Sequence, residues 1–329
     1  MNKAVRIAIL LLLLILVGVI RHQWQQNARS EPAPIFARQT GPYAPGDYGG
    51  SIVTADRRTR TYILHIPSGF SPARAYPLIL VFHGGLGSGA RVEKGTDFDA
   101  KANAKDFIVV YPDGIGSNWN DGRGTANPDI NDVGFIHRLI EDLESRLPID
   151  SKRIYATGVS NGGLFSQRLG CDLADVFAAI GPDVGPMPTN LLPKCKPARP
   201  IAVIGIQGAV DPIVPLDGGE VKSLRLFGLG KGGTVESAAS TMNFWASVNG
   251  CNPKPALVHE TPRVDDGTSV YKYSYSDCKS GAPVVYYIVQ GMGHAWPPHT
   301  QTLPQITGRT SENINATDVI WDFFSAISR

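Results

Sequence analysis

The chain has 329 residues, of which 43% are hydrophobic and 18% are charged, and its formal net charge is +2. This composition is typical of a globular protein with a sizeable core and excludes a disordered chain. No cluster of lysine and arginine with interleaved aromatic residues follows the N-terminal segment, so nothing in the charge pattern favours binding to nucleic acid. Length alone leaves one large domain or two small ones open.

Residues 1–21 are expected to form a signal peptide or a signal anchor. Lys3 and Arg6 precede an apolar run at residues 7–20, which is shorter than the about 20 helical residues that a hydrocarbon core requires. The length favours a cleaved signal, whereas the missing small-x-small cleavage triplet keeps an uncleaved anchor open. We therefore expect an exported protein that is secreted, periplasmic or anchored with its folded domain outside, and that contacts a membrane only through this segment.

The next residues, 22–47, are polar and rich in proline, which is typical of a linker. A single folded domain is expected over residues 48–329. It begins with alternating apolar residues that predict a hairpin of two strands, at residues 51–54 and 61–66.

Apolar runs and helical stripes alternate through this domain. Strands are predicted at residues 78–82, 107–111, 153–156, 201–206 and 284–289. Runs that are apolar throughout indicate burial on both faces, as in a parallel sheet. Helices are predicted at residues 132–147, 161–169, 235–248 and 317–327. This order predicts an α/β fold, with a mostly parallel, doubly wound sheet flanked by helices.

The chain has four cysteines, and all of them lie in the part that we expect to be exported: Cys171, Cys195, Cys251 and Cys278. An even number in an oxidising compartment predicts two disulfides. Of the three possible pairings we favour the sequential one, because each bond then closes a short local segment. Free buried thiols are the alternative, and metal binding is disfavoured because no C-x-x-C spacing is present.

Ser160 is the candidate nucleophile. It lies at the centre of Gly-Val-Ser-Asn-Gly at residues 158–162, the only G-x-S-x-G match in the chain, between a predicted strand and a predicted helix. The flanking glycines permit the sharp turn of a nucleophile elbow, which exposes the serine hydroxyl at the end of the strand.

A serine hydroxyl needs a base to become a nucleophile. In proteins with a nucleophile elbow the chain order is serine, acid, histidine, so the base must follow Ser160. Only His259, His294 and His299 do so, and His294 comes just after the strand predicted at 284–289. A histidine that only holds its loop is the alternative. The acid is predicted to be Asp211, just after the strand at 201–206, with Asp217 as its rival. For Asp211 the alternative is a turn residue before proline.

The oxyanion of an acyl-transfer reaction needs backbone donors. We expect one from Asn161, the residue after the nucleophile, and the other from Gly85 in the glycine-rich loop that follows the strand at 78–82. Trp119 and Trp296 either line the substrate pocket or pack the loops, and the sequence does not decide between these roles. No metal or organic cofactor is required by this chemistry.

Several of these motifs occur together in one order, which makes the set far more specific than any single motif. They are His-Gly-Gly at 83–85, Tyr-Pro-Asp-Gly at 111–114, Trp-Asn at 119–120, Asp-Val-Gly-Phe at 132–135, Gly-Val-Ser-Asn-Gly-Gly at 158–163, Asp-Pro-Ile-Val-Pro at 211–215 and Gly-His-Ala-Trp-Pro at 293–297. Over residues 48–329 the chain resembles the secreted polyhydroxybutyrate depolymerase and feruloyl/acetylxylan esterase family.

This resemblance implies the α/β-hydrolase fold, a triad of Ser160, Asp211 and His294, and disulfides like the pairs favoured above. The chain departs from the family at Gln207, where members usually have a histidine close to the glycine of the acid loop. Different hydrogen bonding near Asp211 is therefore expected.

The sequence thus predicts a serine carboxylic ester hydrolase. Its substrate is expected to be a hydroxycinnamoyl, acetyl or hydroxyalkanoate ester, either small or on plant cell-wall polysaccharide or polyester. A serine peptidase or an acyltransferase would use the same machinery, and a non-catalytic binding protein is disfavoured because every part of the machinery is present.

Overall fold

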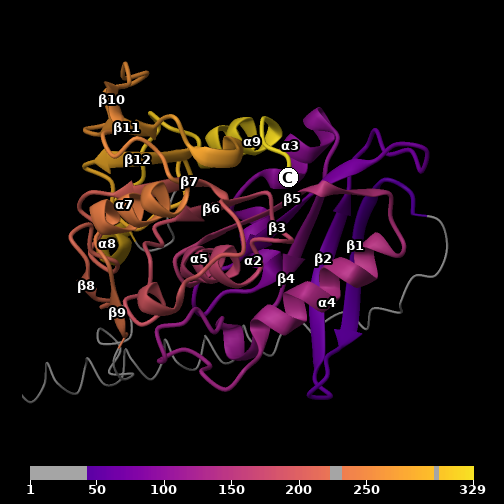
Figure 1. Cartoon of the computed structure of the whole chain (residues 1–329). Helices are drawn as coiled ribbons and strands as arrows, with labels where there is room; N and C mark the ends of the chain where they lie inside the picture. Colours follow the sequence, from indigo (N-terminus) through magenta and orange to yellow (C-terminus); the bar gives the residue numbers. More distant parts are fainter. Residues whose placement is uncertain (1–42, 223–231, 300–303) are drawn as a thin grey trace, which may run out of the picture. The chain divides into compact units, whose positions relative to one another are not determined.

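A ten-stranded sheet runs through the part of the chain that the computed structural model describes, residues 43–222, 232–299 and 304–329 (Figure 1). The strand order is β1-β2-β4-β3-β5-β6-β7-β12-β11-β10. From β4 to β12 in that order every pair is parallel, whereas the pairs at both ends are antiparallel. The predicted, mostly parallel sheet is confirmed.

The bounds of the elements are as follows. The strands are β1 (Gly46–Val53), β2 (Thr59–Ile66), β3 (Tyr76–Phe82), β4 (Ile108–Pro112), β5 (Ile149–Val159), β6 (Ala179–Asp183), β7 (Ala202–Gly208), β10 (Ala256–His259), β11 (Ser269–Tyr275) and β12 (Val284–Gln290), with β8 (Gly219–Glu220) and β9 (Thr234–Val235) pairing separately. The helices are α2 (Gly89–Lys94), α3 (Phe98–Lys105), α4 (Asp132–Glu144), α5 (Asn161–Asp172), α7 (Ala238–Val248), α8 (Pro304–Thr307) and α9 (Ala316–Ser325).

Helices cover both faces of the large sheet, because its central strands are apolar on both sides. In β3, Leu80 and Phe82 belong to the core shared with α4, α5 and α7, whereas Ile79 and Val81 belong to the core shared with α3 and α9. Burial of both faces explains why this strand is a continuous apolar run rather than an alternating one.

The predicted helices are confirmed, with shifts of a few residues at their ends. No end moves by more than three residues, and one of these shifts is at α7, which begins at Ala238 instead of residue 235. Val235 pairs with Gly219 in the small sheet, and the Ser237 side chain then caps the helix by accepting from the backbone N–H of Ser240. Strand pairing therefore competes with the helix for these first residues.

The sequence did not predict β6 or the antiparallel addition of β10 and β11 to the sheet. β6 reads Ala-Ile-Gly-Pro-Asp, a short segment without an apolar run, although it is completely buried between β5 and β7. This strand matters because it separates the strand that precedes Ser160 from the strand that precedes Asp211.

At the N-terminus, β1 begins at Gly46, two residues before the expected start of the domain. The Tyr43 ring already packs edge-on against the Tyr48 ring, with centroids 5.2 Å apart. The expected targeting segment, residues 1–21, and most of the expected linker, residues 22–47, lie outside the described residues.

Two disulfides join Cys171 to Cys195 and Cys251 to Cys278, which confirms the favoured sequential pairing. The first ties the end of α5 to the segment before β7, and the second ties the segment after α7 to the segment before β12. In the residues that the structure describes, no helix has both the length and the apolar character needed to cross a bilayer.

Candidate active site

Ser160 follows β5 directly and stands at the N-terminus of α5. Its backbone has φ 57° and ψ −120°, a conformation that residues with a side chain rarely adopt and that occurs mainly at functional sites. A Cβ at Gly162 would collide with the carbonyl oxygen of Phe82, so glycine is needed where α5 starts against the end of β3. This is the strand-to-helix turn that the sequence predicts.

Asp211 lies just after β7, and its carboxylate is held by three neighbours. Oδ1 accepts from the backbone N–H groups of Ile213 (2.8 Å) and Val214 (2.9 Å), and Oδ2 lies 2.7 Å from Nδ1 of His294. An ionised carboxylate can only accept, so Nδ1 of His294 carries the hydrogen and Nε2 is left as the acceptor. A general base at this position needs that tautomer.

The rival residues do not share this arrangement. Asp217 is exposed, His259 lies on the edge strand β10 with its ring stacked on Tyr271, and Nε2 of His299 lies 3.2 Å from Asp97. Among the described residues, Asp211 and His294 are therefore the acid and histidine that the structure brings together after Ser160.

Gln207 holds the loop that carries Asp211. It is buried, and its Nε2 donates to the carbonyl of Val214 across the loop (3.0 Å). A Cβ at Gly208 would collide with the carbonyl oxygen of Gly293, so the acid loop packs directly against the loop that carries His294. At the position where the resemblance leads one to expect histidine, glutamine thus supplies a donor that anchors the acid loop.

Ser160, Asp211 and His294 all follow parallel strands that end at the same edge of the sheet. β5, β6, β7 and β12 are consecutive neighbours in the sheet, and the backbone N–H of Ser160 donates to the carbonyl of Asp183 at the end of β6 (2.9 Å). Within the described ranges no hydrogen bond joins Ser160 Oγ to His294. Without substrate this contact is often long, and it tightens in the complex.

The backbone N–H groups of Gly85 and Asn161 donate to no acceptor in the part of the chain that the structure describes. Their segments are neighbours, because a Cβ at Gly85 would lie 3.8 Å from Cβ of Asn161 and a Cβ at Gly84 would lie 3.5 Å from Cβ of Ser160. Both expected oxyanion donors therefore lie beside the serine and remain available.

His83 precedes these glycines and has a structural place. Its Nε2 accepts from the backbone N–H of Gly114 (2.9 Å), and its Nδ1 donates to the carbonyl of Gly84 (2.7 Å). Burial lowers the pKa of His83 below its ordinary value, which keeps the ring neutral and able to accept. The ring thereby joins the glycine-rich loop to the loop after β4.

No protein-family model matches the chain. The chain is 35% identical over 243 residues to feruloyl esterase B of Piromyces equi, which covers 72% of this chain and 42% of that protein. It is 31% identical over 274 residues to feruloyl esterase C of Emericella nidulans, which covers 81% of this chain and 84% of that protein. The chain thus spans less than half of the first relative and most of the second.

The chain belongs to the feruloyl and acetylxylan esterase family. The expected class of enzyme, a carboxylic ester hydrolase, is confirmed at the level of this family.

Solved structures agree on the fold of this esterase. An acetyl xylan esterase from Aspergillus awamori aligns with a TM-score of 0.56 at 14% identity and covers 84% of this chain and 98% of that one. The feruloyl esterase module from Clostridium thermocellum, in complex with sinapinate, aligns with a TM-score of 0.50 at 14% identity, over 81% and 88% of the two chains. The expected α/β-hydrolase fold is confirmed.

In this esterase both candidate pocket tryptophans are buried and hydrogen-bonded within the fold, which favours the packing role of the two that the sequence leaves open. Trp119 is fully buried, stacks on Phe165 and donates its Nε1–H to the carbonyl of His83. Trp296 is also buried, and its Nε1–H donates to Oγ1 of Thr317 on α9 (3.1 Å).

Two buried carboxylates beside the site could not be predicted from the sequence. Asp121 accepts from Nδ2 of Asn161 (2.6 Å), so it touches the residue that carries an expected oxyanion donor. Asp183 ends β6, and neither of its carboxylate oxygens has a hydrogen-bond partner among the described residues. Burial, followed by the charge of Asp211, raises the pKa of Asp183 well above its ordinary value. Burial beside the acid loop thus favours the neutral form of the Asp183 carboxyl group.

Among the described residues one group could hold a metal ion. It consists of Asp47, His65 and Asp99, whose ligand atoms lie within 4.8 Å of one another. These atoms already have partners, since Nδ1 of His65 lies 2.5 Å from Oδ1 of Asp47 and the Tyr111 hydroxyl donates to Oδ1 of Asp99 (2.6 Å). The group contains none of the expected catalytic residues, and independence from a metal or cofactor stays a prediction.

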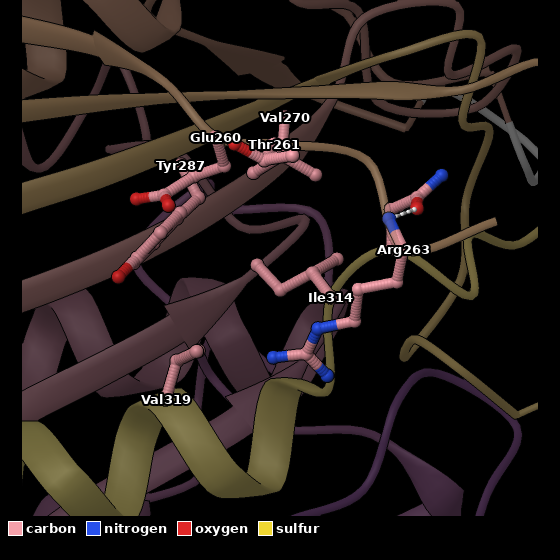
Figure 2. Close-up of a pocket in the computed structure, with 8 residues that line it drawn as sticks. Glu260, Thr261, Arg263, Val270, Tyr287, Ile314 and Val319 are labelled. Atoms are coloured by element: carbon pink, nitrogen blue, oxygen red, sulfur yellow. Dashed lines mark hydrogen bonds between the residues drawn. The ribbon is translucent and has the colours of Figure 1, made fainter.

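A cavity of about 130 Å³ lies where β11, β12 and α9 come together (Figure 2). Its lining residues are Glu260, Thr261, Arg263, Val270, Tyr287, Asn313, Ile314 and Val319. None of these is Ser160, Asp211 or His294, and none of them is a serine or cysteine nucleophile. This cavity is therefore separate from the candidate active site.

Proposed function

We propose that Ser160, His294 and Asp211 form the catalytic triad of this esterase. The observation that carries the proposal is the hydrogen bond between His294 and Asp211 at the sheet edge where the elbow of Ser160 also ends. A buried, hydrogen-bonded acid that holds the imidazole in one tautomer is what a general base for a serine nucleophile requires.

The reaction follows from these positions. Ser160 Oγ forms a bond to the carbonyl carbon of the ester while its proton passes to Nε2 of His294, and the carbonyl oxygen becomes an oxyanion. The N–H groups of Gly85 and Asn161 donate to that oxygen. The alcohol then leaves with the proton from His294 and an acyl-enzyme remains, which water hydrolyses by the same sequence of steps.

Hydroxycinnamoyl esters are the proposed substrates, as small esters or on plant cell-wall polysaccharide. Both relatives described above are named feruloyl esterases, and the one from Emericella nidulans aligns over 84% of its length. Acetyl esters of xylan are the second candidate, because a bifunctional acetylxylan esterase/xylanase of Neocallimastix patriciarum is 29% identical over 152 residues. Hydroxyalkanoate esters are the third candidate and rest on the motif resemblance alone.

The proposal includes export of the domain, with residues 1–21 as a signal peptide or anchor and residues 22–47 as a linker. Two disulfides support it, because structural disulfides persist mainly in oxidising compartments. The mass of the mature protein shows whether residues 1–21 are cleaved or kept as an anchor.

Two assays test the proposal. Ser160→Ala should abolish the hydrolysis of p-nitrophenyl esters, and full turnover by that variant would rule out Ser160 as the nucleophile. Wild-type protein should hydrolyse methyl ferulate with a higher kcat/KM than acetylated xylan or hydroxybutyrate oligomers. A preference for either of the latter would reassign the substrate, and faster cleavage of a matched amide would favour a peptidase. Transfer of the acyl group to a sugar in preference to water would favour an acyltransferase.

A further inference from the structure

The two expected oxyanion donors belong to different segments. Gly85 lies in the loop after β3, and Asn161 begins α5. Both N–H groups have to lie about 2.7–3.1 Å from one oxygen in the transition state, so a small change in their spacing removes one of the two hydrogen bonds. The structure must therefore hold the two segments at a constant separation.

Trp119 connects these two segments. Its indole Nε1–H donates to the carbonyl of His83, two residues before Gly85 (3.0 Å). Its backbone N–H donates to Oδ1 of Asn161 (2.7 Å), and its carbonyl accepts from Nδ2 of Asn161 (3.1 Å). The ring stacks on Phe165 of α5 with centroids 5.1 Å apart. Trp119 thus contacts the glycine-rich loop after β3 on one side and the start of α5 on the other.

Asp121 fixes the orientation of the Asn161 amide in this link. Oδ2 of Asp121 accepts from Nδ2 of Asn161 at 2.6 Å, and the same carboxylate pairs with Nε (2.9 Å) and a terminal nitrogen (2.7 Å) of Arg123. Because a carboxylate accepts only, the NH₂ group of Asn161 must face Asp121, which leaves its oxygen for the N–H of Trp119. The Asp121 side chain is 0% exposed and Arg123 is buried too, so this ion pair is shielded from water.

We propose that Asp121, Trp119 and the Asn161 side chain are positioning residues that hold the N–H groups of Gly85 and Asn161 at the spacing required by the oxyanion. The inference rests on the proposed function, because it takes Ser160 as the nucleophile. The three side chains act through backbone groups and need not touch the substrate. Their loss should therefore weaken stabilisation of the transition state more than binding of the ground state.

Asp121→Asn is the first test, because it keeps the shape and removes the charged acceptor. A whole oxyanion donor is worth about 10² to 10³ in rate, so displacing one should lower kcat about 10- to 100-fold with KM changed by less than about twofold. Trp119→Phe is the second variant, needed if the first does not fold. It keeps an aromatic ring against Phe165, loses the hydrogen bond to His83, and should lower kcat about 10-fold.

Two further measurements separate positioning from general damage. The affinity for a boronic acid, which forms a tetrahedral adduct with the serine, should fall by the same factor as kcat/KM. The pH profile of kcat/KM should stay in place, because the hydrogen bond between His294 and Asp211 is untouched. Asp142→Asn is the matched control, since it removes a partly buried ion pair between Asp142 of α4 and Arg146 and should lower stability while kcat and boronate affinity stay constant.

The outcomes decide separately on the inference and on the function. Folded Asp121→Asn and Trp119→Phe variants with wild-type kcat, beside an inactive Ser160→Ala, would overturn the inference and leave the proposed function intact. A lowered kcat with unchanged boronate affinity would also overturn the inference, because the oxyanion donors would then be in place. A displaced pH profile would overturn it too, because the residues would then act through the triad. Activity in Ser160→Ala would overturn the proposed function itself.

Discussion

Nδ1 of His294 lies 2.7 Å from Oδ2 of Asp211, although 83 residues separate the two in the chain. The contact depends on the packing of β7 beside β12 and on the close approach of the two loops that follow them, at Gly208 and Gly293. Backbone N–H groups of Ile213 and Val214 hold the other carboxylate oxygen. The acid is thus held rigidly against the imidazole.

Asp211→Asn should lower kcat by about 10⁴. The amide can donate to Nδ1 of His294, which would select the tautomer whose Nε2 carries the hydrogen and cannot accept the proton of Ser160. Steady-state kinetics on a p-nitrophenyl ester measures the effect. Asp217→Asn is the control, because this exposed residue of the same loop should keep kcat within about twofold. A larger loss at Asp217 than at Asp211 would reverse the assignment of the acid.

Asp183→Asn should make the protein more stable at pH 8 than the wild type. Burial and the charge of Asp211 raise the pKa of Asp183 in the folded state, whereas the unfolded chain releases this proton near its ordinary pKa of about 4. As pH rises above that value the unfolded state binds fewer protons, so the contribution of Asp183 to stability falls.

An amide at position 183 does not ionise, so the variant loses this dependence. Urea titrations from pH 5 to pH 8 measure the free energy of unfolding of both proteins. The value for the variant minus the value for the wild type should become more positive as pH rises. A difference that stays constant over this range would show that Asp183 is not held neutral by the fold.

Leu86→Gly should raise the free energy of unfolding by about 0.5–1 kcal/mol. Leu86 follows the expected donor Gly85, has φ 62° and is exposed. The left-handed region costs a residue with a side chain about 1–2 kcal/mol, so glycine at this position relieves that strain. The greater entropy of glycine in the unfolded chain offsets about half of this stabilisation. Leu257 is exposed on β10 and does not have a positive φ, so Leu257→Gly should instead lower stability. Thermal unfolding of both variants measures the two effects. A loss of stability in both would contradict the strain at Leu86.

Replacing Cys171 and Cys195 together by alanine should lower the free energy of unfolding by about 2–4 kcal/mol. The bond closes a loop between positions 24 residues apart and so restricts the unfolded chain. Denaturant titrations with and without reductant provide the check. Reductant should destabilise the wild type more than the variant, which keeps only the bond from Cys251 to Cys278. Equal sensitivity in both proteins would contradict a formed bond at Cys171.

The chemistry that the sequence could predict is that carried by local motifs and by chain order. Ser160 has glycines around it at a strand-to-helix junction, and His294 follows the last strand of the parallel series. Gly85 follows the first of these strands. Each of these positions is defined by the end of an element that an apolar run already marks, so the sheet brings them to one edge without further information.

The residues that could not be predicted depend on contacts between distant loops. Asp121 lies 40 residues from Asn161, and no local pattern distinguishes it from any other loop aspartate. Asp183 ends a strand that has no apolar run to mark it. The orientation of Trp119 depends on a space between β3 and α5 that only the packed structure defines, which is why a pocket wall and a packing residue looked equally suitable in the sequence.

Chemical labelling of the nucleophile tests the central claim most directly. Wild-type protein treated with a fluorophosphonate should lose all esterase activity as one equivalent is incorporated, and peptide mapping should place the phosphonyl group on Ser160. The Ser160→Ala variant should incorporate none. Stoichiometric loss of activity with the label on another residue, or full activity in fully labelled protein, would contradict the assignment of Ser160 as the nucleophile.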